Sequence, residues 1–342
     1  MNKQEVALVD KPDNKSILIT GGTGFAGRYA IKRIVNQGHH VYALVRSSQR
    51  LEEALGSQFV NHNSLCVIEK ASPEKASVEE LRTLMEQRQI SSVVHIGAVA
   101  REYSGTPWSR YLETNVEWTK NLALAFLQAD VPHNKFVFTS TVGVYGTIPQ
   151  QTPADEETPY NPDGKYHKSK MLAEHELLAL KDSGLPLVII RPSIMYGTGD
   201  FGFLYKVFRL SKMKLYPLSS SNPQFHLLDV ELLAEVYAKL VEPQPQRFGV
   251  LNVCDREPVA AKTLLNYIKN SVQANYLTVP SSVFSFLKGL SRLNAQRSIS
   301  FKLIDESWSY NVKRLEQTLG YESQNTLGSL ESKYLPWYRG AA

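Results

Sequence analysis

The sequence predicts an α/β fold in which helices connect the strands of a parallel sheet. Short apolar runs typical of buried strands recur up to Arg191, and segments of helical periodicity lie between them. Because parallel strands need crossover connections, this alternation indicates a doubly wound sheet with helices on both faces. Beyond Arg191 the alternation weakens. The last ~85 residues show mostly helical spacing of apolar residues, which predicts a smaller, mostly helical lobe.

Each element is predicted from its own apolar pattern. Apolar runs predict strands at 16–19, 38–46, 64–68, 92–97, 135–139, 186–191 and 250–253. Helical spacing predicts helices at 29–35, 78–87, 108–130, 164–182, 205–214 and 230–240. The segment 108–130 contains neither Pro nor Gly and carries Leu122, Phe126 and Ala129 at helical spacing, so it predicts one long helix.

The weakening of the pattern also predicts how the chain divides. Residues 15–191 and 225–255 are expected to form a cofactor-binding domain, since strand and helix patterns return near 230–253. Residues 192–224 and 256–342 are expected to form a discontinuous substrate-binding lobe, with loops near Pro280 and Ser323. Helical apolar spacing in 283–293 is expected to serve core packing, with a lid over the cleft or a partner-facing helix as the alternatives.

Composition excludes several classes of function. The 342 residues are 43% hydrophobic and 21% charged with a net charge of +5, as in ordinary globular proteins. No dense Lys/Arg run with interleaved aromatic residues appears, which argues against nucleic acid. Cys66 and Cys254 show no metal-ligand spacing, so no metal is expected. The charged segment 1–15 is unlike a signal peptide, and no run of ~18 apolar residues exists, so a cytoplasmic protein without a membrane span is expected.

A glycine-rich turn is the first chemical motif. The segment 20–27, TGGTGFAG, lies between an apolar strand and a helical pattern, which is the context of a dinucleotide-binding fold of Rossmann type. Gly21 can turn the chain sharply, Gly24 leaves room for a pyrophosphate, and Gly27 lets the helix pack close to the strand. The helix N-terminus then offers free N–H groups to phosphates.

A Tyr–Lys pair is the second motif. Tyr166 and Lys170 lie at i and i+4, so both side chains share one face of the expected helix. A phenol with an ordinary pKa of ~10 is a poor acid–base catalyst at neutral pH. A nearby ammonium favours the phenolate, so Lys170 is expected to lower the pKa of Tyr166.

Hydroxyl groups at the end of the fifth expected strand form the third motif. Ser140 and Thr141 follow this strand, and ligands bind at the carboxyl ends of strands in doubly wound sheets. Either hydroxyl could hold a substrate oxygen beside Tyr166.

In this order and separation, the three motifs resemble the extended short-chain dehydrogenase/reductase family, also called the NAD(P)-dependent epimerase/dehydratase group. Four further segments are similar to segments of that family: 94–98 (VHIGA), 114–116 (TNV), 191–197 (RPSIMYG) and 226–230 (HLLDV). Near the C-terminus, Lys313 and the Leu-Gly-Tyr at 319–321 also resemble it, although Tyr310 stands where Ser or Asp is commoner. The resemblance extends from about Ser16 to Trp337.

The resemblance implies roles for individual residues. Tyr166 is the implied general acid/base, Lys170 lowers its pKa and binds the nicotinamide ribose, and Thr141 rather than Ser140 is the catalytic hydroxyl. The implied cofactor-binding residues are Gly21, Thr23, Gly24, Phe25, Ala26, Gly27, Arg46, Ser47, Ala98, Asn115, Tyr166, Lys170, Pro192 and Ser193.

The end of the second expected strand indicates which cofactor binds. Members that bind NAD usually place an acidic residue there, but this chain has Val45 followed by Arg46, Ser47 and Ser48. Arg46 and the two hydroxyls suit a 2′-phosphate, so NADP(H) is favoured and NAD(H) remains the alternative. After the third strand, Lys70 stands where the family usually has an Asp that reaches the adenine amine.

The resemblance leaves several reactions open. Val142 and Gly143 follow Thr141 where 4,6-dehydratases have an Asp-Glu pair, which argues against dehydration. The segments 191–193 and 225–229 look closest to dihydroflavonol reductase-like and 3β-hydroxysteroid dehydrogenase-like members. They favour hydride transfer between NADP(H) and the carbonyl or secondary alcohol of a small molecule.

Two alternatives to hydride transfer to a substrate carbonyl remain: a sugar-nucleotide epimerase and a non-catalytic NADP-binding protein. For the epimerase, Arg209, Lys212 and Lys214 could supply charge to a diphosphate, or form a solvated basic face. The resemblance also implies a homodimer through helices 108–130 and 164–182.

Two polar segments near the motifs are expected to lie outside the site. His167 follows Tyr166 directly and is expected to face away, because adjacent helix positions diverge by ~100°. The acidic residues Asp155, Glu156 and Glu157 are expected to form a solvated loop.

Overall fold

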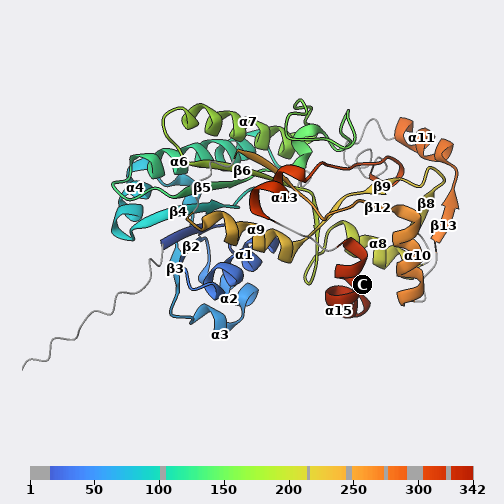
Figure 1. Ribbon diagram of the computed structural model, residues 1–342, viewed down its shortest axis with the longest axis horizontal. Helices are drawn as coiled ribbons and strands as arrows, with labels where there is room; N and C mark the ends of the chain where they lie inside the picture. The colour runs from blue at the N-terminus through green and yellow to red at the C-terminus, as the bar shows by residue number, and fades with distance from the viewer. Residues whose placement is uncertain are drawn as a thin grey trace, which may run out of the picture.

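The computed structural model describes residues 16–100, 105–213, 216–243, 249–272, 276–290, 303–320 and 325–341 (Figure 1). Seven parallel strands form one sheet in the order β11-β6-β5-β4-β1-β2-β3. They are β1 (Ser16–Thr20), β2 (His40–Val45), β3 (Leu65–Glu69), β4 (Ile90–His95), β5 (Lys135–Thr139), β6 (Leu187–Pro192) and β11 (Val250–Val253). The predicted doubly wound parallel sheet is confirmed.

Helices cover both faces of this sheet (Figure 1). One face carries α1 (Phe25–Asn36), α2 (Ser48–Leu55), α3 (Ser57–Val60), α9 (Val230–Val241) and α13 (Lys313–Leu319). The other carries α4 (Val78–Gln87), α6 (Trp118–Gln128) and α7 (Gly164–Lys181). Alternate residues of the strands enter the two cores, as in Ile17 and Ile19 on one face and Leu18 on the other.

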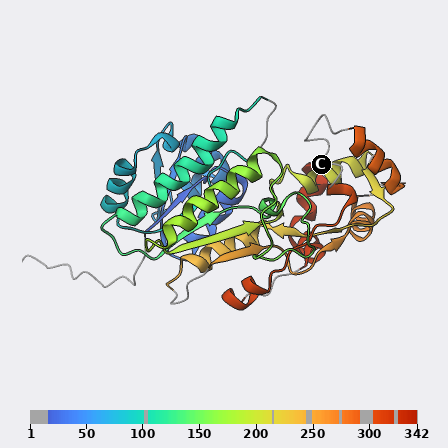
Figure 2. The same cartoon turned by 90° about the horizontal axis from the view of Figure 1, so that it is seen from above.

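A second core lies beyond the sheet, where most of the orange and red segments gather (Figures 1 and 2). Its helices are α8 (Phe203–Lys212), α10 (Ala261–Val272), α11 (Ser281–Leu290), α14 (Thr326–Ser329) and α15 (Leu335–Ala341), with a π-helical turn η5 (Leu330–Tyr334). Three two-stranded pairs join them: β7 (Ile194–Tyr196) with β10 (Leu227–Asp229), β8 (Tyr216–Ser219) with β13 (Tyr276–Val279), and β9 (Gln224–Phe225) with β12 (Val259–Ala260).

The structure corrects some predicted elements. The helix expected at 108–130 is α5 (Trp108–Tyr111), a π-helical segment η2 (Leu112–Glu117) and α6 in succession. Helices α2 and α3 were not predicted, because the segment is short and mostly polar; the Ser47 side chain caps α2 by accepting from the Arg50 amide. The six short strands beyond Arg191 were also not predicted, because strands of two to four residues are too short to show an alternation of apolar and polar residues.

The segment 283–293 is also corrected within its described part. Val283 and Phe286 on α11 are exposed, at 40% and 66%, so these side chains do not serve the core. Residues 291–293 lie outside the described residues, as do 1–15, Lys214, the loop at Ser323, Tyr321 and the final residue of the expected substrate lobe. The division into two domains stays a prediction.

A buried ion pair links the sheet to α7. Arg191, at the end of β6, donates from Nε and Nη2 to the two carboxylate oxygens of Glu174 at 3.1 and 2.6 Å. Both side chains are almost completely buried. Arg191 also donates to the hydroxyls of Tyr145 at 2.7 Å and Tyr160 at 2.9 Å, and Ser140 donates to Glu174. The charges are therefore paired and fully hydrogen-bonded, as burial requires.

Replacing Glu174 by Gln is expected to destabilise the protein by about 3 kcal/mol, because the Arg191 charge stays buried without its counter-charge. Urea unfolding at neutral pH measures this loss. The matched control is Glu176→Gln on the same helix. More than a third of the Glu176 side chain is exposed, and its ion pair with Lys120 is worth about 0.5 kcal/mol. Equal losses in the two variants would contradict the role of the buried pair.

Candidate active site

A cleft of about 750 Å³ opens at the carboxyl ends of the parallel strands. Its walls come from the glycine-rich turn after β1, from the ends of β2, β4, β5 and β6, and from the second core. Strands β2 and β3 follow β1 to one side of the sheet and β4 to β6 lie on the other. The cleft therefore lies at the switch in strand order, where doubly wound sheets bind ligands.

The glycine-rich turn fits a dinucleotide phosphate. Gly21 has a φ of +77°, and a Cβ on it would lie 2.6 Å from the Gly97 amide nitrogen. A Cβ on Gly27 would lie 2.1 Å from the Gly21 carbonyl oxygen, so only glycine lets α1 start this close to β1. No side chain caps α1 at Gly24. Its first N–H groups, beside cleft residues Phe25 and Ala26, remain for an anion.

The three predicted catalytic residues line this same cleft. Thr141 follows β5, and its Oγ1 accepts from the Gly143 amide at 3.1 Å. Ser140 also reaches the cleft, but its hydroxyl donates to the buried Glu174 carboxylate. Tyr166 and Lys170 extend from α7 one turn apart. The structure thus brings together the residues that the motifs singled out across the sequence.

Burial sets the protonation of Tyr166 and Lys170. Burial raises the pKa of Tyr166 to about 12. Burial lowers the pKa of Lys170 to about 7, against a smaller opposing effect of Glu174. The Lys170 Nζ donates to the Thr139 carbonyl at 2.7 Å and lies 4.5 Å from the centre of the Phe138 ring. The pKa of Tyr166 is therefore raised and not lowered as expected, because loss of hydration disfavours the phenolate; the effect of Lys170 on Tyr166 stays a prediction.

The predicted cofactor-binding residues divide into two groups. Most of them line the cleft: Gly21, Thr23, Gly24, Phe25, Ala26, Arg46, Ala98, Tyr166, Lys170, Pro192 and Ser193. Gly27, Ser47 and Asn115 do not line it. Ser47 caps α2, while Asn115 is buried and bonds to both backbone groups of Val99 and to the Ser169 hydroxyl. Asn115 therefore ties the segment after β4 to α7.

His167 lines the cleft, which corrects the expectation that it faces away. Its Nδ1 lies 3.1 Å from the Asp163 carboxylate, one turn earlier. A Cβ on Gly143 would lie 2.3 Å from its Nε2. The ring turns toward the cleft because Asp163 holds one side of it and Gly143 leaves space on the other. Asp163 at i−4 and Gly143, two residues after Thr141, were the available sequence signals.

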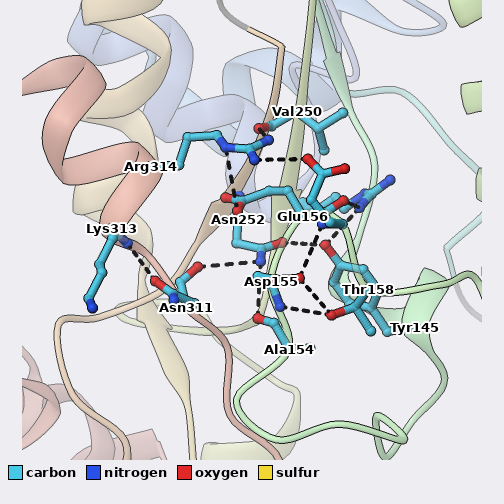
Figure 3. A network of polar contacts seen from close by, with 12 residues as sticks. Tyr145, Ala154, Asp155, Glu156, Thr158, Val250, Asn252, Asn311, Lys313 and Arg314 are labelled. Carbon is cyan, nitrogen blue, oxygen red and sulfur yellow. Dashed lines mark hydrogen bonds and ion pairs between the residues drawn. The ribbon is translucent and has the colours of Figure 1, made fainter.

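The Glu156 side chain is only 4% exposed, which corrects the expected solvated loop at this residue, whereas the Glu157 side chain is exposed as expected. The Glu156 carboxylate accepts from the Asn252 amide at 2.8 Å, and Arg314 lies 3.7 Å away (Figure 3). The Asn252 side chain accepts from the Tyr145 hydroxyl at 2.8 Å. The backbone of Ala154 pairs with that of Tyr310. These contacts fasten the segment between Thr141 and Tyr166 to β11 and to the chain before α13.

The far wall of the cleft is largely aromatic and aliphatic. It is formed by Ile194, Met195, Phe201, Phe203, Leu303, Trp308 and Tyr310. The Phe203 ring meets the Trp308 ring edge to face, with centroids 5.9 Å apart. Among the described residues that line the cleft, the only Lys and Arg residues are Arg46, Arg110 and Lys170. Arg209 and Lys212 do not line it.

The wall near Arg46 holds residues that sequence reasoning missed. Glu74 and Arg110 line the cleft there and form an ion pair of 2.8 Å. Thr114 and Trp118 follow Arg110 at successive turns of the same helix and also line the cleft. Thr114 begins the family-like segment 114–116, whereas Arg110 and Trp118 lie in none. The i, i+4, i+8 spacing of the three is the sequence signal that indicates a common face.

Comparison with known proteins identifies the family. Residues 17–254 match the model of the NAD dependent epimerase/dehydratase family, so the chain belongs to this family, as the motifs predicted. It is 26% identical over 326 residues to UDP-glucose 4-epimerase of Vibrio cholerae, covering 93% of this chain and 94% of that protein. It is 29% identical over 201 residues to 3-beta-hydroxysteroid dehydrogenase of Mycolicibacterium neoaurum, covering 58% and 52%.

The fold matches solved structures as well. The crystal structure of the Bordetella bronchiseptica enzyme WbmG in complex with NAD superposes with a TM-score of 0.76 at 21% identity, covering 98% of this chain and 97% of that one. This likeness confirms the Rossmann-like fold. In the described part of the chain, no helix is long and apolar enough to cross a membrane. No group of three metal-ligating side chains occurs there either.

The depressed pKa of Lys170 predicts a pH dependence of stability. An unfolded chain holds this lysine protonated up to its ordinary pKa of 10.5, whereas the folded chain releases the proton near pH 7. The unfolded state therefore binds more protons between these values, and the Lys170 contribution to stability rises with pH across this window. We expect Lys170→Met to flatten the rise that urea unfolding measures from pH 7 to pH 9. The exposed Lys168→Met is the control, and an unchanged slope in Lys170→Met would contradict the assignment.

Proposed function

We propose that the protein is an NADP(H)-dependent oxidoreductase that transfers hydride between the nicotinamide and a carbonyl or secondary alcohol of a small molecule. The observation that carries the proposal is the convergence of Thr141, Tyr166 and Lys170 in the cleft that also holds the glycine-rich turn. A protein that only binds the cofactor has no need of this set of side chains, which argues against the non-catalytic alternative.

The glycine-rich turn and the α1 N-terminus would hold the pyrophosphate, and Lys170 would hold the nicotinamide ribose. When bound, the cofactor supplies or accepts the hydride. In the reductive direction Tyr166 gives its proton to the substrate oxygen; its raised pKa keeps it protonated at neutral pH. The Thr141 hydroxyl orients the same oxygen, and Lys170 stabilises the phenolate that remains after the proton has left.

The apolar wall supports a substrate with an apolar body. Phe203, Trp308 and Leu303 offer apolar surface, whereas a sugar nucleotide brings a diphosphate that needs cations. Arg46 and Arg110 lie with Glu74 on the wall that the cofactor would occupy, and Lys170 would bind the nicotinamide ribose. The aromatic wall therefore favours a carbonyl compound with a ring or hydrocarbon body over a nucleoside diphosphate sugar.

Tyr166→Phe is expected to lower turnover about 1,000-fold, because the proton donor is lost. NADPH affinity, measured by fluorescence titration, should stay within about threefold, since the ring remains in place. Tyr267→Phe on α10, outside the cleft, serves as the control and should keep full turnover. Turnover near the wild-type rate in Tyr166→Phe would remove Tyr166 from the mechanism.

The choice of NADP(H) rests on Arg46, which lines the cleft at the end of β2. A guanidinium there can bind a 2′-phosphate through charge-assisted hydrogen bonds. Arg46→Ala should therefore weaken NADPH binding about 10- to 100-fold and leave NADH binding unchanged. Arg50→Ala, on the exposed side of α2, is the matched control. The choice would be overturned in favour of NAD(H) if the wild type bound NADH more tightly than NADPH and Arg46→Ala changed neither affinity.

A sugar-nucleotide epimerase is the second candidate, favoured by the near full-length similarity to UDP-glucose 4-epimerase. An epimerase returns the hydride to the same substrate, so it would interconvert UDP-glucose and its 4-epimer without net use of NADPH. We also propose the homodimer through α5–α6 and α7 and the cytoplasmic location that the family resemblance and the sequence suggest; sedimentation equilibrium tests the first.

A further inference from the structure

We propose that His167, held by Asp163, is a specificity-determining residue that hydrogen-bonds a hydroxyl group of the substrate, placed on the first or second carbon from the reacting carbonyl. This narrows the substrate class to hydroxy ketones, or to the corresponding diols in the oxidative direction. The inference rests on the proposed function, because it needs a carbonyl compound held at Tyr166. His167 lies inside the Tyr–Lys motif, but the motif gives it no role.

Asp163 is a fixed acceptor for the imidazole ring. Its Oδ1 accepts from the Thr147 amide and from the Thr147 hydroxyl, both at 2.9 Å, and lies 3.1 Å from His167 Nδ1. Burial acts to raise the pKa of Asp163, but hydrogen bonds from His167 and Thr147 outweigh it and leave the pKa below its ordinary value. An ionised carboxylate only accepts, so Nδ1 of His167 carries a proton and donates it to this bond. The contact with Asp163 therefore fixes both the orientation of the ring and the place of that proton.

The other ring nitrogen of His167 is left for a ligand. The residue lines the cleft, its side chain is 23% exposed, and Nε2 makes no hydrogen bond to the described residues. A Cβ on Gly143 would lie 2.3 Å from Nε2, so the ring can occupy this position only because Gly143 has no side chain. One nitrogen held by a carboxylate and the other open to a cleft is an arrangement in which histidine binds ligands.

His167 lies where a substrate at Tyr166 would reach it. The centroids of the two rings are 5.6 Å apart, so their polar atoms can serve oxygens on nearby carbons of one molecule. Asp163 also lies near the aromatic wall, because burial raises the pKa of Tyr310 and the charge of Asp163 adds a smaller effect. The pair of Asp163 and His167 is therefore close to the wall that the substrate body would contact.

A neutral hydroxyl suits this pair better than a carboxylate does. Nε2 accepts a hydrogen bond when the ring is neutral and donates one when the ring is protonated. A hydroxyl both donates and accepts, so it pairs with either form. A carboxylate only accepts, and Asp163 already balances the charge of a protonated ring, so little net attraction to an anion would remain. Burial of a carboxylate beside the aromatic wall without a net positive charge is costly.

The test uses ketones of similar size that differ in one substituent: 2-hydroxy- against 2-methylcyclohexanone, and 3-hydroxy- against 3-methylcyclohexanone. With NADPH, the ratio of kcat/KM for the hydroxy ketone to kcat/KM for the methyl ketone is measured in each protein. The comparison is made between proteins because the hydroxyl also changes the intrinsic reactivity of the ketone. We expect His167→Phe to lower the ratio about 5- to 10-fold for at least one pair, as for the loss of one hydrogen bond. The exposed His175→Phe on the same helix, outside the cleft, is the matched control and should keep the wild-type ratios.

Gly143→Ala provides a second and independent change. Its Cβ would occupy the place of the imidazole, so the ring must turn away although its chemistry is unchanged. We therefore expect Gly143→Ala to lower the same ratio as His167→Phe does. If His167→Phe does not fold, the ratio in Gly143→Ala decides the outcome.

Ratios unchanged in His167→Phe for both pairs, with the ketones reduced, would overturn this inference and leave the proposed function standing. A merely structural role of His167 gives this result, because it would slow the hydroxy and methyl ketones equally. A fall confined to the ratio of 3-oxocyclohexanecarboxylate to 3-methylcyclohexanone would assign His167 to an anion and overturn the choice of a hydroxyl. Reduction of none of these ketones by the wild type would overturn the proposed function, and this inference with it.

Discussion

The buried pair of Arg191 and Glu174 is the interaction on which the site depends. Glu174 lies one turn after Lys170 and two turns after Tyr166, so the three side chains share one face of α7. Fixing Glu174 against the end of β6 fixes the rotation of the helix. It also holds the end of β5 through Ser140, which leaves Thr141 to the cleft. This ion pair thereby links the elements that carry all three predicted catalytic side chains.

The same burial that makes this pair costly to break governs the chemistry beside it. A low-dielectric region disfavours any charge without a partner, which explains the depressed pKa of Lys170, the raised pKa of Tyr166 and the lowered pKa of the buried His95. Arg191 stays charged there because two hydroxyls and a carboxylate surround its guanidinium.

The sequence predicted the parts of the molecule that depend on local pattern. The seven strands, the glycine-rich turn and the Tyr166–Lys170 pair follow from periodicity, from glycine's freedom of φ and from helix spacing, and all lie where expected. The choice of Thr141 over Ser140 came from the family resemblance, and both residues line the cleft. Residues whose role depends on distant partners were misjudged. The Glu156 side chain is buried because Asn252 of β11, 96 residues later, and the still more distant Arg314 contact it. No local pattern indicates such contacts.

His167 and Glu74 show that local sequence patterns also fail for some residues inside the cleft. Helix geometry alone directs His167 away from Tyr166, but Asp163 and the space at Gly143 bring it into the cleft. Glu74 lies in a short 3₁₀ turn after β3, lines the cleft and pairs with Arg110, 36 residues later. The spacing of residues along the chain cannot predict the pairing of Glu74 with Arg110, because the two meet only when the distant helix α5 packs near the turn after β3.

Hydride transfer to a substrate carbonyl is the central activity proposed for this protein. The decisive measurement incubates the protein with NADPH deuterated at the transferable C4 position and a panel of alicyclic and aryl ketones, with UDP-glucose in a parallel reaction, and follows the label by mass spectrometry. We expect deuterium at the carbinol carbon of a ketone-derived alcohol, with one equivalent of NADP formed for each alcohol. Conversion of UDP-glucose to its 4-epimer without consumption of NADPH, and no labelled alcohol from any ketone, would contradict the account.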